Sequence, residues 1–163
     1  MPRIARRREI DAAPAAVWSL VSDPYNLPRW WPRTVRVENV DRKDAGKRSQ
    51  WTKVLETADG RGVRADYRCI SSHEGERFVW EQQLAGTPFD RILRRSVIEI
   101  DLQPIDGGSK VTLTSRQTLR GLSRLGSPMM RRATRRTLDD ALDGIERALV
   151  GTSAEHEPGE SET

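Results

Sequence analysis

The chain has little of what stabilises secreted proteins or anchors a protein in a membrane. Of its 163 residues one is a cysteine, Cys69, so no disulfide can form within the chain. No apolar run approaches the roughly 20 residues that a membrane-spanning helix needs. The first ten residues, MPRIARRREI, lack the apolar core of a secretory signal. Together these absences predict a protein of the reducing cytoplasm.

The sequence also lacks the motifs of nucleotide and metal enzymes. It contains no phosphate-binding loop, no glycine-rich dinucleotide fingerprint, no paired C-x-x-C and no H-E-x-x-H. Its two histidines, His73 and His156, fall in a predicted turn and in the acidic C-terminal segment. Cys69 lies on an apolar strand face and is expected to be an inert packing residue, not a nucleophile. We therefore predict no metal site and no cofactor.

Positive charge is in excess, but it is scattered along the chain. The net charge is +4, and residues 152–163 contain four glutamates and no lysine or arginine, so the remainder carries about +8. Such a balance is typical of proteins that bind nucleic acid or anionic lipid. A coding sequence rich in G and C, which favours arginine over lysine, is the other explanation. Because the arginines form no single stripe, we favour the second explanation and expect no nucleic-acid partner.

Length and composition predict one folded domain over residues 1–151, large enough to bury a core without disulfides. Residues 152–163 are expected to form a disordered acidic tail. This segment contains Pro158 and Gly159 but no large apolar side chain, so it cannot offset the entropy of ordering.

A long amphipathic helix is predicted over residues 128–150, with Ser127 as its N-cap and Gly151 as its C′ residue. The opposite, charged face suggests three i,i+4 ion pairs within the helix: Arg135 with Asp139, Arg136 with Asp140, and Asp143 with Arg147. The apolar face consists of Met130, Thr134, Thr137, Leu138, Ala141, Leu142, Ile145, Ala148 and Leu149. Something must cover this face, and most of the preceding chain has the pattern of strands.

Alternation with a period of two predicts about seven strands, at residues 3–11, 35–40, 49–57, 63–71, 77–84, 94–102 and 110–119. Turn signals such as Asp59-Gly60 join most of them as hairpins, which implies an antiparallel sheet. Two short helices are expected after the first strand, from Pro14 to Asp23 and from Tyr25 to Trp31. The predicted fold class is α+β, with a curved antiparallel sheet wrapped around the terminal helix.

The first strand places two arginines, Arg6 and Arg8, on the same face as Ile4 and Ile10. We expect their charged ends to reach solvent near the strand end. A charged anchor inside a cavity is the alternative.

Three segments carry a family likeness: IDAAPAAVWSLVSDPYNLPRWWP, IEIDLQPIDGGSKVTL and LRGLSRLGSPMMRRATRRTLDDALDGIERAL. The chain resembles the START/Bet v 1-like (SRPBCC) superfamily over residues 3–150, and specifically its polyketide cyclase/dehydrase and lipid-transport branch. This resemblance implies a helix-grip fold. It says less about activity, because the superfamily includes ligand carriers, aromatase/cyclases and ubiquinone-binding proteins.

The resemblance implies a cavity between the sheet and the terminal helix, which would bind a hydrophobic or polyketide-like molecule as a carrier or sensor. Apolar walls with a few hydrogen-bonding groups suit an organic ligand. The alternative is that the same side chains pack a solid core. Strand alternation gives most of the candidate ligand-binding residues, and the apolar face of the terminal helix adds the last two: Trp51, Leu55, Tyr67, Phe78, Trp80, Gln82, Ser96, Ile98, Ile100, Leu113, Ser115, Gln117, Met130 and Thr134.

Cyclase activity is the first alternative, because the aromatase/cyclases of the superfamily promote aldol cyclisation and dehydration of poly-β-keto chains. Such chemistry needs a group that moves protons. Tyr67 and Arg94 are weak catalytic candidates, since strand parity turns both inward. Asp66, Glu81, Glu99 and Asp101 are predicted to face outward, and a bulge would reverse any of these assignments. The lack of an inward carboxylate or histidine argues against an enzyme.

A movable edge would let a ligand enter such a cavity. Gly121 and Gly126 in the linker before the terminal helix, and Trp30 and Trp31 after the short helices, are the candidate gate residues. The second alternative function is transient contact with an anionic membrane or a partner protein through basic residues. Those residues are Arg120, Arg124, Arg131, Arg132, Arg135 and Arg136. Nothing in the sequence indicates an oligomeric state.

Overall fold

The computed structural model describes residues 3–41, 49–57, 59–121 and 127–151. In chain order the elements are β1 (Arg3–Ile10), α1 (Pro14–Val21), the 3-10 helix η1 (Pro24–Asn26), α2 (Leu27–Trp30), β2 (Thr34–Asp41), β3 (Gln50–Glu56), β4 (Gly62–His73), β5 (Arg77–Gln83), the 3-10 helix η3 (Pro88–Arg91), β6 (Leu93–Ile105), β7 (Gly108–Leu119) and α3 (Ser127–Leu149). The predicted terminal helix therefore begins and ends one residue earlier than expected. The predicted acidic tail lies outside the described residues.

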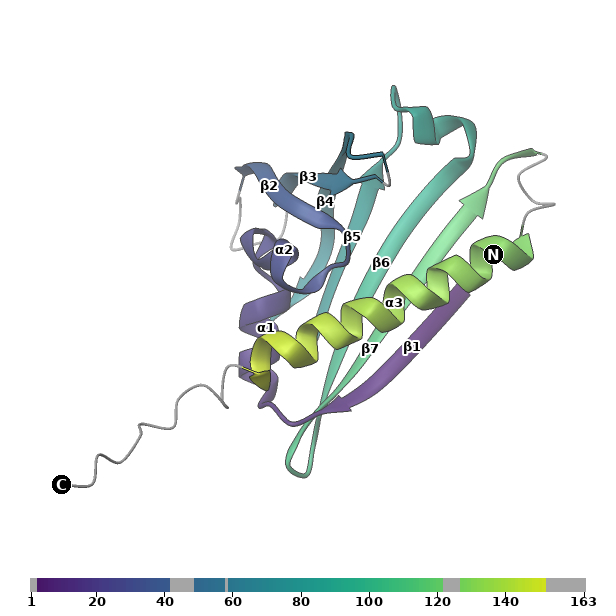
Figure 1. The fold of residues 1–163 in the computed structure, drawn as a ribbon. Helices are drawn as coiled ribbons and strands as arrows, with labels where there is room; N and C mark the ends of the chain where they lie inside the picture. Colours follow the sequence, from purple (N-terminus) through teal and green to yellow (C-terminus); the bar gives the residue numbers. More distant parts are fainter. Residues whose placement is uncertain (1–2, 42–48, 58, 122–126, 152–163) are drawn as a thin grey trace.

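The seven strands form one sheet in the order β1-β7-β6-β5-β4-β3-β2, and every neighbouring pair is antiparallel (Figure 1). From β2 to β7 each strand pairs with the next along the chain, as the hairpin signals predicted. Gly60 and Gly107 occupy left-handed backbone conformations at two of these turns, with φ of +78° and +80°. The predicted fold class is confirmed.

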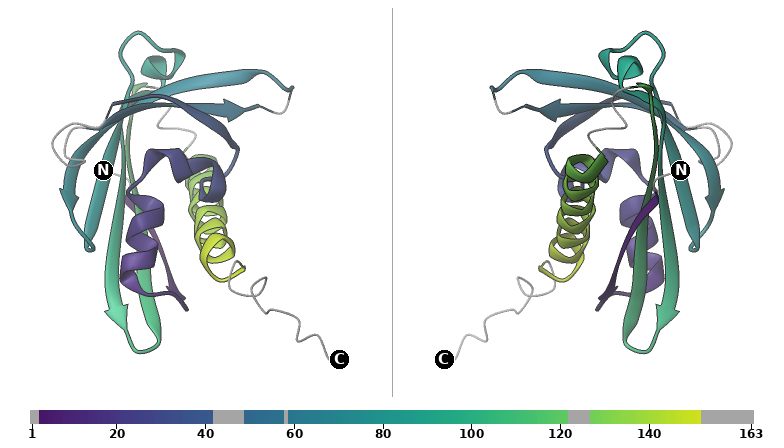
Figure 2. Two further views of the ribbon diagram at one scale, coloured as in Figure 1. Left: turned by 90° about the vertical axis from the view of Figure 1, so that its left-hand side faces the viewer. Right: turned by 90° about the vertical axis from the view of Figure 1, so that its right-hand side faces the viewer.

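The sheet bends around α3, which crosses its concave face. Figure 2 shows β2, β3 and β4 arching over the side on which α2 and α3 lie. Register shifts interrupt the β2–β3 and β4–β5 pairings, and such bulges increase the local bend and twist of a strand. Leu138, Ala141, Leu142 and Ile145 of α3 are at most 1% exposed and form the core with the inner face of the sheet.

The short helix α2 crosses α3 closely, and Gly144 makes the crossing possible. A Cβ atom at Gly144 would overlap the carbonyl oxygen and Cα of Trp30, so any side chain there would force the two helices apart. This contact fixes the position of α2 and of Trp31, which follows it. Among the described residues, no helix is both long enough and apolar enough to cross a membrane.

None of the three ion pairs predicted within α3 forms among the described residues, and for two of them an arginine of β1 pairs with the carboxylate instead. Arg6 donates to both carboxylate oxygens of Asp139, at 2.8 and 3.0 Å, and Arg8 pairs with Asp143. Both arginines lie on the face of β1 that turns toward α3, where they tie strand to helix at the surface. Arg6 is exposed, as predicted, and Arg8 is half-buried. The bond to Asp139 raises the pKa of Arg6.

Candidate functional site

A continuous cluster of aromatic rings covers the inner face of the most strongly bent part of the sheet. Trp51 on β3 stacks on its cross-strand partner Tyr67 on β4, with ring centres 6.2 Å apart. Trp51 also meets Trp80 on β5 edge to face at 6.0 Å. Trp31, supplied by the chain after α2, lies 5.4 Å from Trp80. The cluster therefore joins three strands to the crossing of α2 and α3.

Lys53 lies inside this aromatic cluster. The alternation of β3 turns it to the inner face, where its cross-strand partner is Ala65, whose small side chain leaves space beside it. Lys53 Nζ lies 4.3 Å from the centre of the Tyr67 ring, 4.6 Å from that of Trp31 and 5.9 Å from that of Trp80. The residue is 2% exposed. Aromatic rings thus replace the water that usually surrounds a lysine.

No carboxylate of the described residues forms an ion pair with Lys53, and no described group accepts a hydrogen bond from it. Burial lowers the pKa of Lys53 to about 7. The ring faces act in the opposite direction, because they attract the cation. An amine that titrates near neutral pH can serve as a cation, a base or a nucleophile. Burial also raises the pKa of the neighbouring Tyr67, which stays a neutral phenol at pH 7.

Lys53 was not among the residues that the sequence singled out. The alternation of Gln50–Glu56 did place it on the inner face, between Trp51 and Leu55. A cation flanked by two apolar residues on an inward strand face is the signal that could have identified it. For proton transfer the sequence indicated Tyr67 and Arg94 instead, and it offered no inward carboxylate or histidine.

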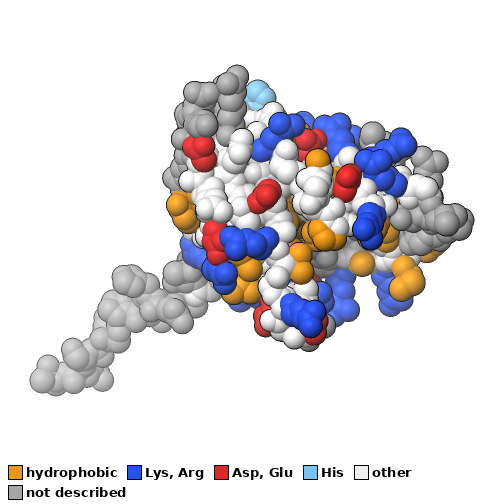
Figure 3. Space-filling model, turned by 90° about the horizontal axis from the view of Figure 1, so that it is seen from above, with side chains coloured by type: hydrophobic (Ala, Val, Ile, Leu, Met, Phe, Trp, Pro, Cys, Tyr) orange, Lys and Arg blue, Asp and Glu red, His pale blue; other side chains and the backbone are white. Residues whose placement is uncertain are grey.

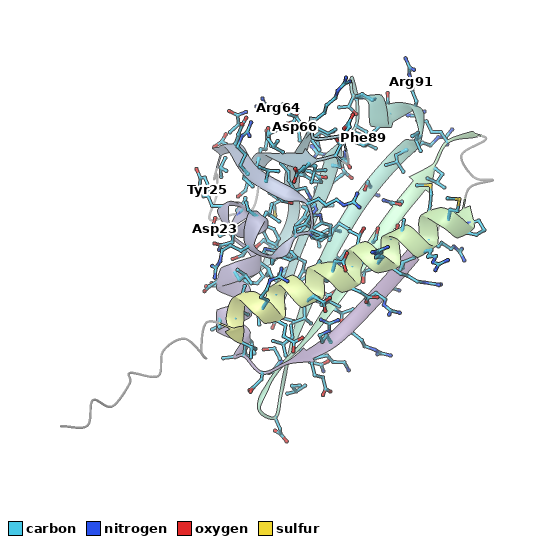
Figure 4. The ribbon with its side chains drawn as sticks, in the orientation of Figure 1. Asp23, Tyr25, Arg64, Asp66, Phe89 and Arg91 are labelled. Carbon is cyan, nitrogen blue, oxygen red and sulfur yellow. The ribbon has the colours of Figure 1, made fainter. Side chains whose placement is uncertain are left out.

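A groove of about 760 Å³ opens beside the aromatic cluster, between α3 and the ends of β3 and β4. The cross-strand pair Leu55 and Val63 belongs to its sheet wall, and Phe89 contributes from η3 (Figure 4). Trp31 both lines the groove and lies over Lys53, so it connects the two. The complete lining is Trp31, Pro32, Arg33, Leu55, Glu56, Thr57, Val63, Phe89, Met129, Arg132, Ala133, Arg136, Thr137 and Asp140.

The structure distributes twelve of the fourteen predicted ligand-binding residues over three environments. Leu55 lines the groove. Seven belong to the packed core: Trp51, Tyr67, Phe78, Trp80, Ile98, Ile100 and Leu113. Four line a small hollow of about 20 Å³ between α3 and the β1–β7 edge of the sheet: Ser115, Gln117, Met130 and Thr134. Ser96 is buried and Gln82 half-buried.

The two weak catalytic candidates differ in their surroundings. Tyr67 is in contact with Lys53 through its ring. Arg94 is exposed, because a register shift between Leu93 and Arg95 interrupts the alternation of β6 at this point. Arg94 therefore does not share the inner face with Ser96, as strand parity had predicted.

The four gate candidates also separate. Trp31 is at the groove, whereas Trp30 is buried against Gly144 of α3. Gly121 ends the described part of the linker in a left-handed conformation, with φ of +51°, and Gly126 lies outside the described residues.

The possible metal ligands of the chain are its histidine, cysteine and acidic side chains, and Cys69 is its one cysteine. Among the residues that the structure describes, no three of these side chains come together as a metal site. Cys69 is buried, its thiol donates to the carbonyl oxygen of Ser71 at 3.4 Å, and burial raises the pKa of this thiol. His73 is exposed at the end of β4.

On the face of the molecule seen from above, the described basic residues do not form one continuous patch (Figure 3). Seen from above, lysine and arginine side chains are spread over the molecule with acidic side chains among them (Figure 3). Arg120 pairs with Asp90 at 3.2 Å, while Arg132 and Arg136 lie along the groove. Arg124 lies outside the described residues.

A known protein family shares sequence features with this chain, and solved structures share its fold. The family model "Polyketide cyclase / dehydrase and lipid transport" matches residues 1–150. No curated protein matches the chain by sequence.

Solved structures share the fold at low identity. TTHA0849 from Thermus thermophilus is 20% identical, with a TM-score of 0.74, over 93% of this chain and 99% of that one. A START superfamily protein from Mycobacterium smegmatis is 15% identical, with a TM-score of 0.73, over 92% and 98%. StfQ, a di-domain ARO/CYC from the steffimycin biosynthetic pathway, is 13% identical, with a TM-score of 0.76, over 94% of this chain and 52% of that one. Because the family model spans nearly all of the described fold, the chain belongs to the polyketide cyclase/dehydrase and lipid transport family.

Proposed function

We propose that the protein binds a hydrophobic or polyketide-like small molecule in the groove between α3 and the β3–β4 wall, as a carrier or sensor. The groove itself is the observation that carries this proposal. Its volume of about 760 Å³ falls in the range of small-molecule sites, roughly 300–1,000 Å³. Leu55, Val63, Phe89 and Met129 supply apolar surface, and Thr57 and Thr137 supply hydrogen-bonding groups.

The ligand site that we propose lies nearer the helix than the one predicted from alternation alone. Trp51, Phe78, Trp80, Ile100 and Leu113 are at most 2% exposed and pack against one another. Rings that already fill the centre of the fold leave the groove as the larger space for a ligand, with Trp31 as its inner wall.

Filling the groove tests the proposal. N-phenyl-1-naphthylamine, an uncharged fluorescent probe, should bind the protein and quench tryptophan fluorescence, since Trp31 lines the groove. Thr137→Trp places a large ring in the groove and should weaken probe binding at least tenfold. Thr112→Trp, on the other face of the sheet, is the matched control and should leave binding unchanged. Equal binding by both variants would contradict a ligand site in the groove.

Polyketide aromatase/cyclase activity is the second candidate, and Lys53 is the observation that favours it. Aldol cyclisation begins when a base removes a proton from the carbon next to a carbonyl group, and a buried amine with a pKa of about 7 can do this. Lys53→Met should then abolish turnover of a poly-β-keto substrate with little effect on its affinity. A carrier would show no turnover in either form.

Contact with an anionic membrane is the remaining alternative. Met129 is 83% exposed at the start of α3, close in sequence to Arg131 and Arg132. Vesicles of anionic lipid should bind the protein in a salt-dependent manner if these residues form a membrane contact.

A further inference from the structure

Five buried side-chain polar atoms have no hydrogen-bond partner among the described residues: Nε1 of Trp30, Trp51 and Trp80, Oγ1 of Thr34 and Nε of Arg116. Two of the five belong to the aromatic cluster around Lys53. The indole Nε1 atoms of Trp51 and Trp80 are buried, and neither donates to an acceptor among the described residues. Both rings belong to the cluster that surrounds Lys53, and Trp80 lies 5.9 Å from its Nζ. Lys53 itself has no described carboxylate or carbonyl partner.

The unpartnered groups of the aromatic cluster, the indole N–H groups of Trp51 and Trp80 and the ammonium form of Lys53, are all hydrogen-bond donors. An ammonium and an indole N–H can donate but cannot accept, so they cannot satisfy one another. Leaving a buried donor without an acceptor destabilises a fold, and the cost is larger for a charged group. The aromatic cluster therefore has positive charge and donors in excess, and what would satisfy it is an acceptor that carries negative charge.

We propose that Lys53 binds an acidic oxygen of the ligand, a carboxylate or the enolate or phenolate of a polyketide-like molecule, while the apolar body of the ligand lies in the groove. This inference rests on the proposed function, because the groove must hold the rest of the molecule. Nothing in it requires catalysis, so it applies to a carrier; a cyclase with Lys53 as its base would instead need the neutral amine in the complex with its substrate.

The placement of Lys53 relative to the groove fits such a ligand. Leu55, two residues farther along β3 on the same face, lines the groove, and two residues of a strand span about 7 Å. Trp31 lies at the groove on one side and over Nζ at 4.6 Å on the other. Rotation of the Trp31 ring would thus open the path from the groove to the amine. The acidic end of an extended molecule would then reach Lys53 while its chain contacts Leu55 and Val63.

The charged groups along the groove supply the competing explanation. Arg33, Arg132 and Arg136 also line it and could attract an anion near the surface, whereas Glu56 and Asp140 would repel one. An exposed arginine contributes little to the binding of an anion, because water screens it. A buried ammonium distinguishes an anionic ligand from a neutral one more strongly than an exposed arginine does. Replacing Lys53 therefore shows whether this residue or the groove arginines bind the acidic oxygen.

Matched ligand pairs test the proposal. We would measure the binding of decanoate and 1-decanol at pH 7 by calorimetry, together with 7-hydroxycoumarin and 7-methoxycoumarin as an acidic phenol and its blocked form. The acidic member of at least one pair should bind the wild-type protein roughly 10- to 100-fold more tightly, as expected for a charge-assisted hydrogen bond. The pair that shows the preference identifies the ligand as a carboxylic acid or as a phenol or enol.

Lys53→Met should abolish this preference and leave the affinity for the neutral members within about twofold. Lys53→Gln keeps a hydrogen-bond donor without the charge and should also abolish the preference for the acidic ligand. Agreement between the two variants would show that the loss is not caused by how methionine packs. Lys110→Met removes a half-buried lysine of β7 as the matched control and should retain the preference.

Two results would overturn the inference while the proposed function stands. In the first, acidic and neutral ligands bind the wild-type protein equally. In the second, the preference persists in both Lys53 variants, which would assign it to the groove arginines. If none of these ligands and no uncharged probe binds, the proposed function fails, and this inference fails with it.

Discussion

Lys53→Met should change how the stability of the protein depends on pH, and the structure determines the direction. Burial lowers the pKa of Lys53 to about 7 in the folded protein, against an ordinary value of 10.5. Below pH 7 the amine is protonated in both states, and the folded state carries a buried cation. Between pH 7 and 10.5 the unfolded chain binds the additional proton, so the free energy of unfolding rises with pH.

The size of this effect follows from the difference between the two pKa values. When the two pKa values differ by about 3.5 pH units, the free energy of unfolding changes by about 5 kcal/mol over the whole titration. About 4 kcal/mol of this change falls between pH 6 and pH 10. The ring faces of Tyr67 and Trp31 reduce it, because each stabilises the cation by about 1 kcal/mol. The wild-type free energy of unfolding, relative to that of Lys53→Met, should therefore rise by about 2–4 kcal/mol over this range.

Urea unfolding followed by tryptophan fluorescence at pH 6, 7, 8, 9 and 10 measures this difference directly. Comparison with the variant removes the contributions of the other titrating groups, which both proteins share. Lys110→Met controls for the loss of a lysine as such and should follow the wild-type curve. A difference between wild type and Lys53→Met that stays constant from pH 6 to pH 10 would refute a buried, destabilised cation at this position.

Two substitutions test the packing of α3. Gly144→Ala should destabilise the fold by about 1–3 kcal/mol, because the new Cβ overlaps Trp30, and this cost exceeds the gain in helix propensity. Calorimetric unfolding measures the loss. Gly151→Ala is the control, because its Cβ would meet nothing within 4 Å. Leu138→Ala should cost about 2–5 kcal/mol in urea unfolding, because Leu138 is 1% exposed; a loss below 1 kcal/mol would show that this helix face is not in the core.

Much of the fold could be predicted from the sequence, because its signals are local. Alternation identified the strands, and residues such as Gly60 and Gly107 marked the hairpins that make the sheet antiparallel. The face of α3 that is buried followed from the spacing of its apolar residues. These features need only a few neighbouring residues to be recognised, so no tertiary information was required.

The ion pairs of α3 show where local reasoning fails. Arg135 and Asp139 stand at the spacing of an intrahelical pair, but Arg6 lies opposite Asp139 in the folded protein. Which cation binds a carboxylate depends on the distance between β1 and α3, which the sequence does not state. Arg94 was wrongly placed for a related reason, since the bulge beside it shifts the strand by one residue.

The candidate site was predicted in part. The inner-face aromatic residues came from alternation, and the structure brings Trp51, Tyr67 and Trp80 together. Whether such residues enclose a cavity or fill one depends on how closely the sheet approaches the helices, and here they fill the centre. The environment of Lys53 could not be predicted, because it requires Trp31 from the end of α2 to lie over β3.

The protonation state of Lys53 in the complex distinguishes a carrier from a cyclase. An anionic oxygen beside Nζ favours the ammonium form, and an ammonium cannot accept a proton from a substrate carbon. A neutral poly-β-keto chain leaves the amine free to titrate near pH 7, where a large fraction is the neutral base. Lys53 therefore cannot hold an acidic ligand and act as a general base in the same complex. The NMR chemical shift of its side chain, measured with an acidic and with a neutral ligand, reports which of the two states each ligand selects.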